Sequence, residues 1–141
     1  MMAYVTINDM VQRFGEVEMI QLTDRDAATG AVDVAVLDAV IADAQAEVDS
    51  YLSVRYALPL AVVPDILRSY TADVARYRLY DTEIPEIVKK RYDDALRFLR
   101  DVSARRASLD KDVNGVEAPV ANGVKISAPA RVFNGANLEG F

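Results

Sequence analysis

Carboxylates are the main side chains that could carry out acid–base chemistry or bind a metal in this protein, because its 141 residues include neither histidine nor cysteine. Histidine is the commonest general base and a common metal ligand, and the serine–histidine and cysteine–histidine nucleophile systems cannot be built without it. Two groups of aspartates stand close together along the chain. Asp24, Asp26 and Asp33 share one polar stretch, and Asp93 directly precedes Asp94.

Neither group has the spacing of an established site. Hard cations bind carboxylate oxygens, but the first group matches no calcium loop and has no glutamate at the twelfth position. Asp33 is better placed to cap a helix. Adjacent residues on a helix, such as Asp93 and Asp94, point about 100° apart and favour ion pairs with bases three or four positions away. We therefore expect no catalytic residue, no metal and no cofactor. An enzyme that uses only carboxylates would need two of them to converge in a cleft.

Helical periodicity governs the first 106 residues, which must position any site. Apolar side chains recur every three or four residues in the segments 6–15, 33–54, 64–80 and 85–102. Thr6 and Asp33 are suitable N-caps, Gly15 is a suitable C-cap, and a further short turn is expected at 16–22. The pattern predicts an all-α fold, an antiparallel bundle of about four helices spanning residues 1–106.

Residues 107–141 have a different composition, with four glycines, two prolines and four asparagines and no helical period. Asn114-Gly115 and Asn122-Gly123 are dipeptides typical of tight hairpin turns. A lone two-stranded hairpin is only marginally stable in water. The sequence therefore predicts an extended, non-helical C-terminal arm that could form a β-hairpin and that is either mobile or ordered by a partner.

Charge is unevenly distributed along the chain, whose net charge is −6. Residues 1–54 hold ten acids and two bases, a balance of −8, whereas residues 55–106 hold eight acids and eleven bases, a balance of +3. This asymmetry suits contacts between copies and disfavours long-range attraction to nucleic acid. The bases between Lys89 and Arg106 nevertheless leave a small helical DNA-binding or regulatory module as an alternative. No apolar run is long enough for a membrane span, and the first residues lack a signal-peptide pattern.

Tyrosines and arginines are the candidates for an interface with a subunit or partner. Six of the seven tyrosines fall between residues 51 and 92, and tyrosine is enriched at interfaces. Arg76 and Tyr80 are four residues apart, which permits a cation–π contact, although core packing of tyrosines in this helix is the alternative. Arg55 and Tyr56 adjoin a stiff corner between Pro59 and Pro64, which would set the angle between two helices.

Four stretches of the sequence together resemble one protein family. They are YVTINDMVQRFGEVEMIQLTD, VDSYLSVRYALPLAVVPDILRSYTADVARYRLY, VKKRYDDALRFL and RVFNGANLEGF. These stretches span nearly the whole chain and resemble the small connector proteins of Mu-like bacteriophages and prophages. The layout is similar to that of head–tail connector, or adaptor, proteins of tailed phages.

The resemblance implies a structural protein of the virion, made in the host cytoplasm and located at the head–tail junction. Such proteins form a ring beneath the portal, bind the portal and tail or stopper proteins, and can be monomeric in isolation. DNA would pass through the channel without sequence-specific binding. Their C-terminal arms pack on neighbouring subunits or on the portal. The resemblance therefore implies that the RVF motif, residues 131–133, is part of an interface. The candidate interface residues are Arg55, Tyr56, Arg76, Tyr80, Arg131, Val132 and Phe133.

Overall fold

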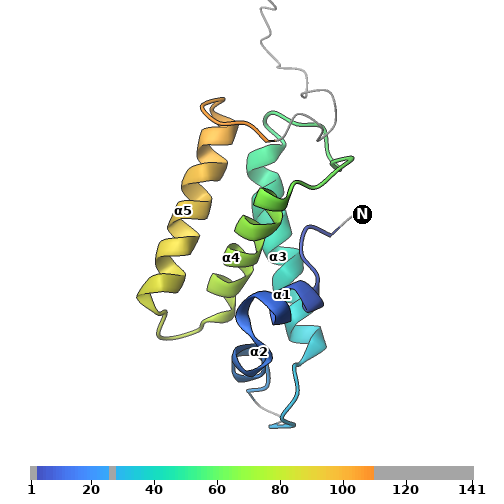
Figure 1. Cartoon of the computed structure of the whole chain (residues 1–141), viewed down its shortest axis with the longest axis vertical. Coiled ribbons are helices and arrows are strands. Elements are labelled where there is room, and N and C mark those ends of the chain that lie inside the picture. Colours follow the sequence, from blue (N-terminus) through green and yellow to red (C-terminus); the bar gives the residue numbers. More distant parts are fainter. Residues whose placement is uncertain (1–2, 26–27, 110–141) are drawn as a thin grey trace, which may run out of the picture.

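The structure, a computed structural model, describes residues 3–25 and 28–109, which form helices joined by loops. The helices are α1 (Ile7–Phe14), α2 (Glu16–Thr23), α3 (Val34–Leu52), α4 (Asp65–Leu79) and α5 (Glu86–Ser103) (Figure 1). The predicted all-α class is confirmed for these residues. The hairpin predicted in the C-terminal arm lies outside the described residues, and the division of the chain after residue 106 stays a prediction.

The described residues contain five helices rather than about four, because α2 is a separate helix. Gly15 has a φ of 94° and is both the C-cap of α1 and the N-cap of α2. That φ is in a region that side chains rarely adopt and glycine adopts readily. At the start of α1, the Thr6 side chain accepts a hydrogen bond from the Asp9 amide and the Asp9 side chain accepts one from the Thr6 amide. This reciprocal pair is a capping box.

Helices α3, α4 and α5 lie side by side and alternate in direction along the bundle (Figure 1). Each packs on the other two, and α1 and α2 pack against α3 near the end where it begins. Aromatic stacking joins α4 to α5: the ring centroids of Tyr77 and Tyr92 are 3.9 Å apart, and those of Tyr70 and Phe98 are 4.7 Å apart. Tyrosines of α4 therefore contribute to helix packing.

The core lies between the three long helices and extends beneath α1 and α2. Its large, fully buried side chains include Met10, Met19, Leu37, Leu52, Leu67, Leu79 and Leu99. Leu109 is also in this core, with 4% of its surface exposed, although it lies beyond the end of α5. The bundle therefore draws on the first residues of the segment that the sequence assigned to the arm.

Among the described residues, no helix is both long and apolar enough to cross a membrane.

Candidate functional site

Asp24 and Asp33 make local structural contacts, and the singled-out aspartates do not converge within the described residues. Asp24 accepts hydrogen bonds from the Thr29 and Gly30 amides at 3.0 and 2.7 Å, and these bonds lower the pKa of its carboxyl. Asp33 caps α3 by accepting from the Val36 amide. Asp26 lies outside the described residues. In residues 3–25 and 28–109, no group of three or more acidic side chains is placed to hold a metal ion.

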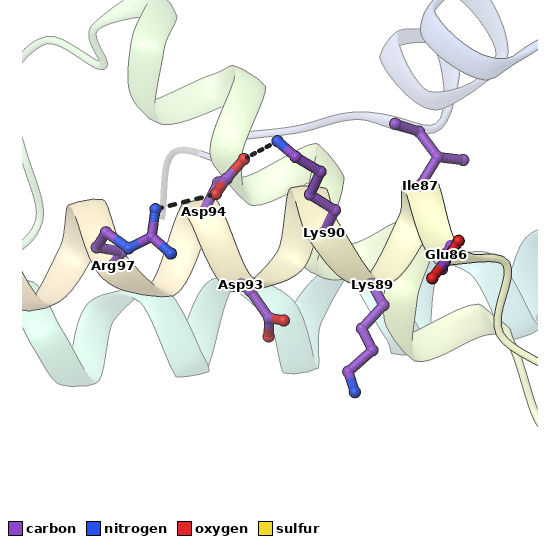
Figure 2. Close-up of a pocket in the computed structure, with 7 residues that line it drawn as sticks. All are labelled: Glu86, Ile87, Lys89, Lys90, Asp93, Asp94 and Arg97. Carbon is purple, nitrogen blue, oxygen red and sulfur yellow. Dashed lines mark hydrogen bonds and ion pairs between the residues drawn. The ribbon is translucent and has the colours of Figure 1, made fainter.

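Asp94 pairs with bases on its own helix, as the sequence predicts. Lys90 Nζ lies 3.1 Å from one carboxylate oxygen, and Arg97 Nη1 lies 3.3 Å from the other (Figure 2). Asp93 points to a different side of α5, so the two neighbouring carboxylates do not face each other (Figure 2). Asp93 and Asp94 therefore belong to the charged surface of α5 and do not form a facing carboxylate pair.

Arg55 and Tyr56 hold the segment after α5 against the end of α3. The Arg55 guanidinium donates to the carbonyl of Val102 at 3.1 Å and to that of Ala107 at 2.5 Å. The Tyr56 hydroxyl accepts a hydrogen bond from the Leu109 amide at 3.1 Å. Both side chains belong to residues only 7% exposed. We call this arrangement of Arg55, Tyr56, Val102, Ala107 and Leu109 the latch.

The latch determines where the chain leaves the bundle. Residues 107–109 return to the corner that follows α3, and the Ser103 hydroxyl adds a 2.6 Å hydrogen bond to the Tyr51 carbonyl. Because Arg55 and Tyr56 are occupied within the fold, little of either side chain is left for a neighbour. A contact between these two residues and another subunit stays a prediction.

Arg76 joins α4 to α1 and α2. Its guanidinium forms two hydrogen bonds with the Glu18 carboxylate, at 2.7 and 2.9 Å, and stacks 4.5 Å above the Phe14 ring. The cation–π contact of Arg76 is thus with Phe14, whereas the sequence suggested Tyr80. Burial, with Glu18 nearby, raises the pKa of Tyr80. Any role of Arg76 and Tyr80 at an interface stays a prediction.

The other three candidate interface residues, Arg131, Val132 and Phe133, lie outside the described residues.

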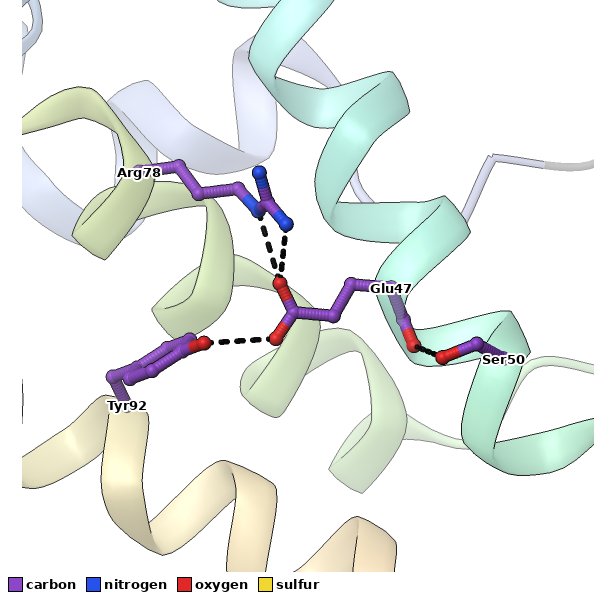
Figure 3. A network of polar contacts seen from close by, with 4 residues as sticks. All are labelled: Glu47, Ser50, Arg78 and Tyr92. Atoms are coloured by element: carbon purple, nitrogen blue, oxygen red, sulfur yellow. Dashed lines mark hydrogen bonds and ion pairs between the residues drawn. The ribbon is translucent and has the colours of Figure 1, made fainter.

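The sequence did not indicate a network that ties the three long helices together. Glu47 of α3 accepts from Arg78 of α4 at 2.5 and 3.1 Å and from the Tyr92 hydroxyl of α5 at 2.9 Å (Figure 3). The Ser50 hydroxyl donates to the Glu47 carbonyl (Figure 3). Glu47, 31 residues from Arg78 and 45 from Tyr92 in sequence, has no local motif that would reveal these partners.

Replacing Tyr92 with phenylalanine should lower the free energy of unfolding by about 1 kcal/mol at neutral pH, because one hydrogen bond to a carboxylate is lost. Burial and the bond to Glu47 raise the pKa of Tyr92 to about 12. Because the folded chain holds this proton more tightly than the unfolded chain, the stabilisation is complete below about pH 10 and is lost as the pH rises through about 12.

Urea denaturation of the wild type and Tyr92→Phe at neutral and alkaline pH measures this difference. The gap between the two proteins should shrink as the pH approaches 12. Glu47→Gln is the matched control, because an amide oxygen can still accept from the tyrosine while the charge pairing with Arg78 is lost. If the difference in stability between the two proteins stayed constant with pH, the raised pKa of Tyr92 and its hydrogen bond to Glu47 would be contradicted.

The segment before α1 is bound to α3 by a second polar cluster. The Tyr4 amide donates to Gln45 Oε1 at 3.0 Å, and the Tyr4 hydroxyl donates to Asp49. Burial raises the pKa of Asp49, although the bond from Tyr4 partly offsets that rise. Burial is also the main reason that the pKa of Tyr4 lies far above its usual range. These contacts fix the N-terminal segment against the long helix.

The sequence is similar to phage proteins over nearly its whole length. The family described as Bacteriophage Mu, Gp36 matches residues 4–128. Gene product J of Escherichia phage Mu is 33% identical over 136 residues, covering 94% of this chain and 95% of the relative. The Mu-like prophage FluMu protein gp36 of Haemophilus influenzae is 30% identical over 110 residues, covering 78% of each chain.

Proposed function

The chain belongs to the Bacteriophage Mu Gp36 family, and from this premise we propose that it is a head–tail connector. In this proposal several copies form a ring beneath the portal and join the capsid to the tail. Its location would be the head–tail junction of the virion, and its partners would be the portal and the tail or stopper proteins.

The observation that carries the proposal is the similarity to a Mu phage protein over almost the full length of both chains. A connector needs a stable body and surfaces for its neighbours, and it needs no catalytic group. The described residues supply a helical body whose three long helices are tied by buried side chains and by the Glu47 network. This arrangement supports a structural role.

We further propose that the protein is not an enzyme and that DNA passes it without being gripped. The sequence offers no histidine or cysteine, and Asp24, Asp33 and Asp94 are engaged in turns, caps or ion pairs. The alternative of a DNA-binding module relies on the bases of α5. Asp94 pairs with two of these, and Asp101 pairs with Arg106 just beyond the helix. These pairs involve three of the seven bases in and just after α5, and the net charge of −6 further disfavours long-range attraction to phosphate.

Electron microscopy of the portal ring of the same phage or prophage, with and without this protein, tests the proposal. We expect added ring-shaped density on the tail-facing side of the portal. An unrelated helical protein of similar size is the negative control. Saturating protein that leaves the portal density unchanged would overturn the connector role, and salt-dependent binding to duplex DNA would favour the alternative.

A further inference from the structure

Helix α3 has an outward side with exposed side chains, which Ala3 and Tyr4 border at Asp49. Its buried side chains follow one side of the helix, whereas four exposed alanines follow the other at spacings of four, three and four residues. These small side chains would let another helix approach closely. Acidic residues flank them, and the α3 face is defined here as Ala35, Asp38, Ala39, Ala42, Asp43, Ala46 and Asp49.

Part of the α3 face is hollowed into a shallow groove. The groove extends from Asp38 to Asp49, and Ile41, Ala42 and Ala46 are among the residues that line it. The residues of α3 include four acids and no base. Arg78 neutralises Glu47, whereas no described residue forms an ion pair with Asp38 or Asp43. The partner of this face should therefore be basic, and a second α3 face would repel it.

The outward side of α5 supplies such a surface on the same chain. Helix α5 and the turn after it carry seven bases and four acids. In the part of the chain that the structure describes, neither Lys89 nor Arg100 has a side-chain partner. The α5 face is defined here as Lys89, Lys90, Asp93, Arg97 and Arg100.

The charges on the two faces have matching spacings. Asp38 and Asp49 are eleven residues apart on α3, as are Lys89 and Arg100 on α5. Eleven residues are close to three helical turns, so each pair lies on one line of its helix with a separation of about 16 Å. One Asp49 oxygen accepts from Tyr4, and the other makes no hydrogen bond within the described residues. The two acids of α3 can therefore face the two bases of α5 whether the helices run parallel or antiparallel.

We propose that the α3 face of one copy docks on the α5 face of a second copy. The inference rests on the proposed function, for which it supplies the contact between neighbouring subunits. Because two different faces meet, each docked pair retains one free face of each kind, so the contact can continue around a closed ring. Asp93 is the one acid of the α5 face, since Asp94 is paired with Lys90 and Arg97, so removing the charge of Asp93 should strengthen the contact.

The lack of cysteine allows a cross-linking test in the full-length protein. One variant carries Ala42→Cys, and another carries Asp93→Cys, each near the middle of its face. Under mild oxidation, we expect the mixture to form disulfide-linked dimers at least about tenfold faster than either variant alone, with slower formation at high salt. Equal rates for Ala42→Cys alone and for the mixture would overturn the pairing of unlike faces.

Charge reversal tests which residues direct the docking. Adding Lys89→Glu and Arg100→Glu to the Asp93→Cys variant should remove the faster cross-linking of the mixture. Adding Asp38→Lys to the Ala42→Cys variant should then restore the faster cross-linking. Glu83→Lys is the matched control, because Glu83 is exposed in the loop between α4 and α5. Unchanged cross-linking after reversal would overturn the proposal.

The cross-linking result can be separated from the test of the connector role, because it requires no portal. If the cross-link fails while the portal gains a ring of density, the assigned faces are wrong and the connector role stands. If the cross-link forms with the expected charge dependence but the portal density is unchanged, the docking faces stand and the connector role falls.

Discussion

Replacing Arg55 with alanine should lower the free energy of unfolding by about 2–4 kcal/mol, the largest stability loss that we expect from a single polar side chain here. The guanidinium is buried and donates to the carbonyls of Val102 and Ala107. Truncation removes a packed side chain and takes the Arg55 donor from the Ala107 carbonyl, whereas the Val102 carbonyl still accepts from the Arg105 amide. The bundle end that includes Leu109 should therefore loosen first.

Urea denaturation followed by circular dichroism measures the loss. Arg100→Ala is the control, because it removes the same charge from an exposed position and should change stability by less than about 0.5 kcal/mol. Tyr56→Phe should lie between the two, at about 1 kcal/mol, since only the hydrogen bond from the Leu109 amide is lost. Equal midpoints for Arg55→Ala and Arg100→Ala would show that the latch does not stabilise the fold.

The latch also shows the limits of sequence analysis for this chain. The corner between Pro59 and Pro64 drew attention to Arg55 and Tyr56, because prolines restrict the backbone next to them. Their partners in the latch are 47 to 53 residues away in sequence. Nothing local indicates such distant contacts, so the sequence suggested a surface where the structure has a buried connection.

Local features were predicted more accurately. The caps at Thr6, Gly15 and Asp33 depend on a few neighbouring residues, and the structure confirms all three. The sequence predicts only a short turn at 16–22, whereas α2 is a separate helix whose Met19 is fully buried in the core. The Glu47 network depends on how α3, α4 and α5 align, which spacing within one helix cannot reveal.

Deleting residues 110–141 should leave the bundle folded and should abolish detectable binding to the portal. Leu109 is the last described residue of the core, and the latch bonds to Ala107 and Leu109 remain intact in this truncation. The deleted segment is rich in glycine, proline and asparagine, a composition that favours folding against a partner rather than alone. Its removal should therefore affect assembly much more than stability.

Co-purification with the portal ring and circular dichroism measure these two effects on the same preparation. A second truncation, which also removes residues 107–109, separates the latch from the arm. It should lose portal binding and should also be less stable, because Leu109 leaves the core and the Arg55 guanidinium loses the Ala107 carbonyl. Full portal binding by the chain that ends at Leu109 would show that the arm is not needed. Loss of helicity in that chain would show that the bundle depends on residues beyond the latch.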